Sequence, residues 1–421
     1  MIAVGVIALL FLLIFLAMPV AFAMLVAGIA GLWVVGDWYS VLGVLKTAPY
    51  QSAASYTLTT FPMFVLMAEV MGATRITGDL FRAASSWLGH MRGGIAYAAV
   101  FGGTLLAAAC GSSSAAAATL CSAIYPEMRK YGYSDSFSTG ALAAVGTLSI
   151  MIPPSIALIL YGILTETSVG LLLIAGVLPG LLTAVIYGVT IYNVQLQERV
   201  PMVKRMRTSL PALPMIVLLV AMLYLIYSGI ATPTEVGALG ALFAFGIGIF
   251  MGRMSMASLK QALFRATRSS AMILAIICFS SIFAVFLSLS GTPQALLLAV
   301  RDSGFGPFPV LLFVLAVLLI LGIFLDQIAI LIIALPLVFP LMTGLGYDAI
   351  WLGVIVVKTA EIGLLTPPVG LNLFIVSGSS RVPVATVAKG VTPFVIAEIF
   401  VLALLVAVPS IATWLPELSR V

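Results

Sequence analysis

The stretch SIMIPPS (residues 149–155) interrupts a long apolar segment, and GLLTPPVGLN (residues 363–372) interrupts a second one further along the chain. Two consecutive prolines remove two backbone N–H donors and clash with the preceding helical turn. Each helix must therefore stop at the prolines and restart after them, which frees backbone carbonyls on the N-terminal side. Serine, threonine and asparagine side chains lie beside those carbonyls, so each break offers hard oxygen atoms that suit Na⁺ better than a soft transition metal.

Both breaks lie in a chain that has the composition of a membrane protein. Of its 421 residues, 62% are hydrophobic and 8% are charged, and the mean hydropathy is +1.25. A water-soluble domain carries roughly a quarter of its residues as charges. We therefore predict an all-α integral membrane protein. No Lys or Arg precedes the apolar start at Val4, and the apolar run continues to Trp33, so we interpret this start as a retained helix rather than a cleaved signal peptide.

Two short basic connections indicate the orientation of the chain in the membrane. Two apolar spans, 211–227 and 235–251, lie between them, so both connections fall on the same side, and the positive-inside rule makes that side cytoplasmic. This assignment places the N-terminus inside and the C-terminus outside. Topology accounts for the basic residues, and we expect no nucleic-acid binding. The basic residues are Arg199, Lys204, Arg205 and Arg207 in the first connection, and Arg253, Lys260, Arg265 and Arg268 in the second.

An internal repeat relates the two halves of the chain. Adding 214 to a position in the first half repeatedly gives the same residue in the second half, without a gap. Glycine and proline set backbone geometry, so the match predicts a shared fold unit. The matched pairs are Pro126 and Pro340, Gly132 and Gly346, Tyr133 and Tyr347, Pro153-Pro154 and Pro367-Pro368, Gly176 and Gly390, and Pro179 and Pro393.

The repeat is expected to have inverted topology. An odd number of membrane crossings separates equivalent segments, which turns the second unit over relative to the first. Inverted repeats are typical of secondary transporters, whose substrate site lies between the repeats near the membrane midplane. The crossings that we predict are 4–33, 52–73, 136–165, 168–195, 211–228, 233–251, 269–290, 349–380 and 390–415.

Each half also contains a predicted re-entrant hairpin. In the first half, two short apolar limbs flank the polar tip Gly111–Ser114. In the second half, the position equivalent to Ser112 is Asp326, again between short apolar limbs. Limbs of about 15 residues extend roughly 22 Å as helices, too short to cross the bilayer comfortably. Non-helical backbone at membrane depth is tolerated where protein or a water-filled cavity surrounds it.

Ionisable residues within apolar segments are candidates for function because burying a charge is costly. Asp326 is the best candidate for a cation site, since it lies at a hairpin tip. Lys358 and Glu361 are three residues apart on one helix and either neutralise each other or leave Lys358 to contact an anion. We expect interfacial positions for the acidic residues near the ends of the predicted spans, namely Glu69, Glu166, Glu235 and Glu398.

The scarcity of cysteine and histidine excludes several chemistries. The chain has three cysteines and one histidine, with none of the spacings typical of zinc sites. An intramembrane enzyme would lack both a histidine base near its serines and a metal cluster. We therefore expect no enzymatic activity and no cofactor.

These residues resemble the large membrane subunit of tripartite ATP-independent periplasmic (TRAP) transporters, and the similarity covers nearly the whole chain. In the first half it rests on GSSSA (111–115), MIPPS (151–155) with Tyr161-Gly162, and AGVLPG (175–180). In the second half it rests on Leu325-Asp326, Pro336 with Pro340, GYD (346–348) and TPPVGLN (366–372).

The resemblance implies Na⁺-driven uptake of an organic acid across the bacterial inner membrane by an elevator mechanism. It implies two partners, a small four-helix membrane subunit and a periplasmic substrate-binding protein. The chain begins directly at its first helix, so we expect the small subunit to be a separate chain. The resemblance also implies hairpins and broken helices at 93–165 and 305–380 as the transport domain, and scaffold or connecting segments at 1–92, 166–268, 269–304 and 381–421.

The resemblance further implies two Na⁺ sites, one in each half, and a set of substrate contacts. The first site would include Gly111, Ser112, Ser113, Ser114, Gly146, Pro153, Pro154 and Ser155. The second would include Gly322, Asp326, Gly363, Thr366, Pro367, Pro368 and Gly370. The substrate contacts would be Ser114, Lys358 and Asn372.

Three other functions are compatible with parts of the pattern. A Na⁺/dicarboxylate symporter of similar architecture would act without partner subunits. A channel would not need two inverted hairpin units around one site. An intramembrane enzyme is the alternative from a different class, and the residue types disfavour it as described above.

Overall fold

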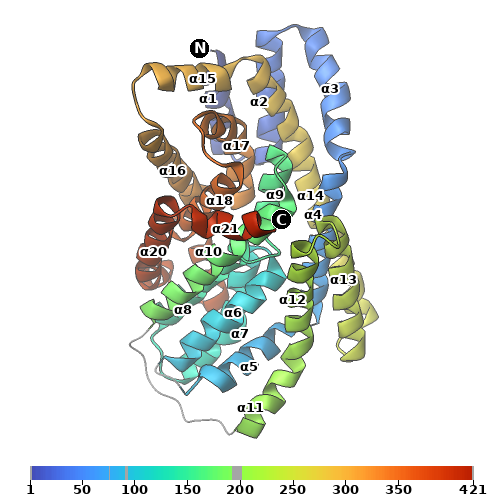
Figure 1. Ribbon diagram of the computed structural model, residues 1–421, viewed down its shortest axis with the longest axis vertical. Coiled ribbons are helices and arrows are strands. Elements are labelled where there is room, and N and C mark those ends of the chain that lie inside the picture. The colour runs from blue at the N-terminus through green and yellow to red at the C-terminus, as the bar shows by residue number, and fades with distance from the viewer. Residues whose placement is uncertain (1, 75, 91–92, 192–201, 420–421) are drawn as a thin grey trace.

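The computed structural model describes residues 2–74, 76–90, 93–191 and 202–419, and every regular element within them is a helix (Figure 1). Arg199, one of the predicted cytoplasmic residues, lies outside the described residues. In Figure 1, α15 lies across one end of the molecule and α11 lies at the opposite end.

The helices of the first half and the central region are α1 (Ile2–Phe15), α2 (Val20–Val35), α3 (Trp38–Ala53), the 3₁₀ turn η1 (Tyr56–Thr59), α4 (Thr60–Ala73), α5 (Ile76–Leu88), α6 (Gly94–Cys110), α7 (Ser113–Lys130), α8 (Asp135–Met151), α9 (Ile156–Thr165), α10 (Val169–Thr190), α11 (Met202–Ser209), the turn η2 (Leu210–Ala212), α12 (Leu213–Tyr227), α13 (Pro233–Phe250) and α14 (Met256–Leu289). The remaining helices are α15 (Thr292–Asp302), α16 (Pro307–Phe324), α17 (Gln327–Gly344), α18 (Ala349–Leu365), α19 (Leu371–Ser380), α20 (Val384–Ala407) and α21 (Ser410–Leu418).

The helix boundaries confirm the internal repeat. Adding 214 to the bounds of α7 gives those of α17, and the same shift converts α8 into α18. The bounds of α6 and α16, and of α9 and α19, agree to within one residue after the shift. The two halves therefore share a unit made of a helical hairpin followed by a broken helix.

The predicted breaks are present at both double prolines. In the first half α8 ends at Met151, and Ser155 caps α9 by accepting a hydrogen bond from the Leu158 N–H. In the second half α18 ends at Leu365 and α19 begins after Gly370, whose φ of +43° places it in a region that favours glycine. The Pro153–Pro154 and Pro367–Pro368 peptide bonds are both cis.

The two hairpins are also present, each with a tip of two residues, Gly111-Ser112 and Leu325-Asp326. Their limbs are longer than predicted, because α6 has 17 residues and α7, α16 and α17 have 18 each. Such helices extend roughly 26 Å, slightly less than the roughly 30 Å of a hydrocarbon core. That both limbs of each hairpin enter and leave the membrane on the same side stays a prediction.

Nine helical segments of the described chain are long and apolar enough to cross a membrane. Seven of them overlap predicted crossings, whereas α16 and α17 are the limbs of the second hairpin. The predicted single crossing 4–33 is wrong, because the chain turns between Phe15 and Val20 and α1 packs against α2. The nine are Tyr56–Ala73, Asp135–Thr165, Val169–Thr190, Arg205–Tyr227, Pro233–Phe250, Met256–Leu289, Pro307–Phe324, Gln327–Gly344 and Val384–Ala407.

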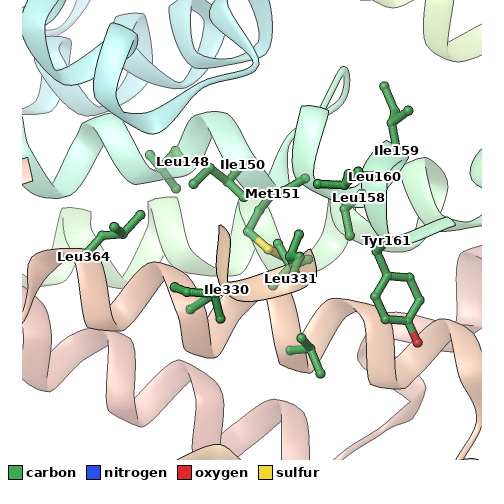
Figure 2. Packing of buried hydrophobic residues seen from close by; sticks show 14 of the residues in the cluster. Leu148, Ile150, Met151, Leu158, Ile159, Leu160, Tyr161, Ile330, Leu331 and Leu364 are labelled. Atoms are coloured by element: carbon green, nitrogen blue, oxygen red, sulfur yellow. The ribbon is translucent and has the colours of Figure 1, made fainter. Parts of the chain in front are cut away.

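The two halves interlock rather than lying side by side. The short helix α9 of the first half packs against α17, and its counterpart α19 packs against α7. Figure 2 shows part of the shared core, in which Met151 of α8 points toward Leu331 of α17. This exchange of helices brings the broken helix of each half to the hairpin of the other half.

Around this interlocked centre, α4 and the 34-residue helix α14 pack against each other, and both also contact helices of the centre. On another side α20 crosses α8 so closely that a Cβ on Gly140 would lie 2.1 Å from the carbonyl carbon of Gly390. Glycine is required at such a crossing because any side chain would separate the two backbones.

Candidate functional site

A cavity of about 250 Å³, which we call the tip cavity, lies where the two hairpin tips meet. The tips of both hairpins contribute to its wall, together with the residues that follow the first break and precede the second. Helices α4 and α14 close the remaining side. The lining residues are Val65, Ala68, Glu69, Gly111, Ser112, Ser113, Ser114, Ala115, Ile156, Ala157, Ser269, Met272, Ile273, Asp326, Gln327, Ile328 and Leu364.

In the first half, the structure brings the hairpin tip to the proline break. Gly111 has a φ of +60°, and a Cβ at this position would lie 3.2 Å from the Pro154 carbonyl oxygen. The hydroxyl of Ser112 does not cap α7, although Ser112 has the extended backbone of an N-cap residue. Gly111 therefore lies next to a carbonyl of the break, and the serines that follow it line the tip cavity.

In the second half, the hairpin and the broken helix are in backbone contact. A Cβ on Gly363 would lie 2.4 Å from the Cα of Gly322, so only glycine pairs allow α16 and α18 to approach this closely. The Gln327 side chain donates a hydrogen bond of 3.4 Å to the Val357 carbonyl. Asp326 caps α17 by accepting a hydrogen bond of 3.3 Å from the Ile328 N–H, and its carboxylate is exposed at the cavity.

Not every residue of the two expected ion sites lines the tip cavity. Gly146 lies on α8, where a Cβ would be 2.7 Å from the Ala117 side chain. The lack of a side chain at Gly146 therefore allows α8 to pack closely on α7. The Thr366 hydroxyl donates to the Ile362 carbonyl at 2.7 Å. The Ser155 oxygen accepts the N–H of Leu158. Four tip residues of the first half (Gly111, Ser112, Ser113 and Ser114) and Asp326 are the expected site residues that line the cavity.

The oxygen groups at the cavity are of the type that hard cations bind. They include serine hydroxyl groups and the carboxylates of Glu69 and Asp326, which fit a small cation such as Na⁺ and offer little to thiophilic metals. Within the described residues, no group of three or more His, Cys, Asp or Glu side chains could hold a metal ion.

Comparison with known proteins identifies the family. Residues 7–411 match the family described as "Tripartite ATP-independent periplasmic transporter, DctM component". The C4-dicarboxylate TRAP transporter large permease protein DctM of Pseudomonas aeruginosa is 36% identical over 375 residues, which cover 87% of this chain and 88% of the relative.

The chain belongs to the DctM family of TRAP transporter large permeases. It is therefore an integral membrane transport protein and not an enzyme.

Two further similarities agree with this assignment. The sialic acid TRAP transporter large permease protein SiaM of Vibrio cholerae is 29% identical to the permease over 421 residues, with 96% of each chain covered. The crystal structure of the YdaH transporter of Alcanivorax borkumensis has a TM-score of 0.68 at 12% identity, and the match covers 90% of this chain and 88% of that one. At that identity, the second similarity supports the fold alone.

The three expected substrate contacts lie in different surroundings in the permease. Ser114 lines the tip cavity. Asn372 is completely buried, and its amide donates a hydrogen bond to the Ser113 hydroxyl, which joins α19 of the second half to the tip of the first hairpin. The Asn372 Oδ1 atom is buried without a hydrogen-bond partner in the described part of the chain. Asn372 is not among the residues that line the tip cavity.

Lys358 lies away from the tip cavity in a buried ion cluster. Its Nζ atom is 2.5 Å from a carboxylate oxygen of Glu398 and 3.6 Å from one of Glu361, and all three side chains are completely buried. The expected pairing with Glu361 is thus confirmed, with Glu398 as a closer partner. The expectation that Glu398 is interfacial is wrong, because hydrophobicity near a span end does not show which face of the helix is buried. The Tyr187 hydroxyl also donates to Glu398.

Sequence reasoning missed the contribution of α4 and α14 to the cavity. Glu69, expected at an interface, lines it and accepts a hydrogen bond of 2.8 Å from Nε of Arg265. Arg265 was assigned only to a cytoplasmic basic cluster. A signal was present in the sequence, because Arg265, Ser269 and Met272 are spaced to lie on one face of a helix.

A larger cavity of about 900 Å³ lies between η1, the end of α9, the start of α13 and the middle of α14. Its wall is rich in hydroxyl groups and includes Glu166. None of the residues expected in the ion or substrate sites contributes to it, so we place the functional site at the smaller tip cavity.

Proposed function

We propose that the permease carries an organic acid into the cell together with Na⁺, across the bacterial inner membrane, and that the tip cavity is the place where solute and ion bind. The observation that carries this proposal is the meeting of both hairpin tips at one cavity. In a duplicated fold, a site between the repeats is the position expected for the substrate of a secondary transporter.

Coupling to Na⁺ is supported by the chemistry of the tips. In the first half Gly111 lies beside the Pro154 carbonyl and three serines line the cavity, and in the second half the Asp326 carboxylate is exposed. Helix ends and freed carbonyls at broken helices are the groups with which transporters coordinate Na⁺. The site with Asp326 carries a formal negative charge, whereas the serine tip does not, so the two sites differ in the charge that they offer to the ion.

An organic acid as the solute is supported by the names of the relatives, which transport C4-dicarboxylates and sialic acid. The cavity volume of about 250 Å³ suits a small solute. Ser114 would contact its polar groups, and Asn372 would act indirectly by holding the Ser113 hydroxyl in place.

The word "tripartite" in the family description supports two partners. We assign these roles to a small membrane subunit beside the permease and to a periplasmic binding protein that delivers the solute. In the elevator mechanism, the hairpins and broken helices move as the transport domain against a scaffold that includes α4 and α14. The tip cavity, which lies between the two groups of helices, would then be carried across the membrane.

The experiment is uptake of radiolabelled organic acids into proteoliposomes under an imposed Na⁺ gradient. One preparation holds the permease alone, a second adds the small subunit, and a third adds the small subunit and the binding protein. We expect saturable uptake in the third preparation only, and its loss when K⁺ replaces Na⁺. Uptake by the permease alone would instead establish a stand-alone symporter, and uptake without dependence on Na⁺ would refute the coupling.

A further inference from the structure

The wall of the tip cavity has a charge that opposes an anionic solute. Its lining includes two carboxylates, Glu69 and Asp326, and no lysine, arginine or histidine. Two like unit charges about 6 Å apart repel each other by roughly 1.4 kcal/mol at an effective dielectric constant near 40. A repulsion of this size lowers the occupancy of the cavity by an anion about tenfold. A Na⁺ ion would offset Asp326, so the charge of Glu69 remains to be neutralised.

Arg265 supplies the missing positive charge at the edge of the cavity. Its Nε atom donates to a Glu69 carboxylate oxygen at 2.8 Å, from α14 to α4. The cavity-lining residues Ser269 and Met272 follow it by one and two helical turns, so all three lie on one face of α14. The side chains of Arg265 and Glu69 are 45% and 28% exposed, so the described residues leave part of each uncovered.

The guanidinium group has binding capacity beyond this ion pair. A guanidinium has five N–H donors, and within the described residues Arg265 uses one of them, the Nε–H, in a hydrogen bond to protein. The remaining donors have the planar arrangement that grips a carboxylate through two parallel hydrogen bonds. Arg268, about one turn further along α14, is exposed as well, but among the contacts of the described residues it is Arg265 that binds Glu69 of the cavity wall.

We propose that Arg265 is the anion-selecting residue of the tip cavity: it cancels the charge of Glu69 and offers its free N–H groups to a carboxylate of the entering solute. This inference rests on the proposed transport of an organic acid. A purely structural ion pair would have a different signature, because removing either partner would then have the same effect. Selection predicts opposite effects, since losing Arg265 makes the wall more negative and losing Glu69 makes it more positive.

The first test measures the charge of the cavity without any solute. Met272 is 57% exposed and lines the cavity, so Met272→Cys serves as the reporter in the full-length permease, purified with its small subunit and with Cys110, Cys121 and Cys278 replaced by alanine. The rates of modification by an anionic and a cationic methanethiosulfonate are compared at low salt. We expect Arg265→Gln to lower the anionic-to-cationic rate ratio by about tenfold or more and Glu69→Gln to raise it.

The matched control is Arg268→Gln, which removes the same charge three residues further along α14 and should leave the ratio within about twofold. Equal ratios in wild type, Arg265→Gln and Glu69→Gln would overturn the proposal. A shift of the same size in the control would overturn it as well, because the effect would then come from general surface charge.

The second test uses uptake of the organic acid that the wild-type complex transports. Arg265→Gln should raise KM by about tenfold with little change in kcat, because it removes binding of the solute rather than the movement that follows. Glu69→Gln should lower KM or leave it unchanged. A KM increase of the same size in both variants would indicate a structural ion pair and contradict the proposal. If wild type transports no organic acid, the proposed function fails, whereas the rate ratios above still decide the charge of the cavity.

Discussion

Asp326 is the residue that makes the two hairpin tips differ in charge, because its counterpart in the first half is Ser112. Its carboxylate is exposed at the tip cavity and is held in place by the N–H of Ile328. The charge can therefore face a cation without leaving the helix cap. This position was predictable from the sequence, since the repeat aligns one polar tip with the other.

We expect Asp326→Asn to raise the Na⁺ concentration for half-maximal uptake by at least about tenfold, because the amide keeps the cap and loses the charge. The measurement is initial uptake as a function of Na⁺ in proteoliposomes. Asp302→Asn serves as the control, since Asp302 is an exposed carboxylate at the end of α15. An unchanged Na⁺ dependence in Asp326→Asn would remove this residue from the ion site.

The buried cluster of Lys358, Glu361 and Glu398 is a second feature at the scale of single residues. Removing one partner of a buried pair leaves a charge without compensation, which typically costs about 3–5 kcal/mol. Lys358→Met should therefore lower the melting temperature of the permease in detergent strongly. Adding Glu398→Gln should recover part of the loss, because one of the two uncompensated carboxylates is gone.

Lys389→Met is the control for this comparison, because Lys389 lies exposed on α20. A melting temperature of Lys358→Met equal to that of the control would show that the cluster does not stabilise the fold. The sequence indicated the contact between Lys358 and Glu361 through their spacing, but it could not indicate Glu398, which is 40 positions further along the chain and meets Lys358 only after folding.

At the scale of elements, the packing of α16 on α18 sets the position of the second tip. A Cβ on Gly363 would lie 2.4 Å from the Cα of Gly322, so Gly363→Ala must push the two helices apart. Overpacking of this kind typically costs about 1–3 kcal/mol. We expect a lower melting temperature and weaker Na⁺ dependence of uptake, because Asp326 lies four residues beyond Gly322 on the same hairpin.

Gly378→Ala provides the matched control, since a Cβ at this position on α19 would meet no atom within 4 Å. Wild-type stability in both glycine variants would mean that α16 and α18 do not approach as closely as described.

Helix ends were the most predictable elements, because proline and glycine fix them locally. The double prolines predicted both breaks, and the constant offset of 214 predicted the equivalence of α7 with α17. The reversal between α1 and α2 was not predictable by the same means. Residues 4–33 are apolar almost throughout, and lipid-facing and protein-facing positions then have the same composition, so hydropathy does not reveal where a chain turns back.

At the scale of the whole molecule, the tip cavity exists because the halves exchange their short helices. The contact between Asn372 and Ser113 joins residues 259 positions apart, and α4 and α14 complete the wall from outside the repeat. The inverted repeat predicted a substrate site between the halves, and the family resemblance implied one ion site in each half. Neither predicted the contribution of α4 and α14 or the charge pair of Glu69 and Arg265, since these depend on how helices pack rather than on how each one begins and ends.

The central claim is that both tips form one binding site for solute and ion. Ala115 and Ile328 line the tip cavity from different hairpins, so Ala115→Cys and Ile328→Cys report on each tip separately in the background without native cysteines. The measurement is the rate at which a thiol reagent labels each variant with and without Na⁺ and the transported acid. We predict that Na⁺ and the acid together slow labelling at both positions, with no effect at an exposed control, Ser303→Cys. Protection of one tip with unchanged labelling of the other would contradict the account.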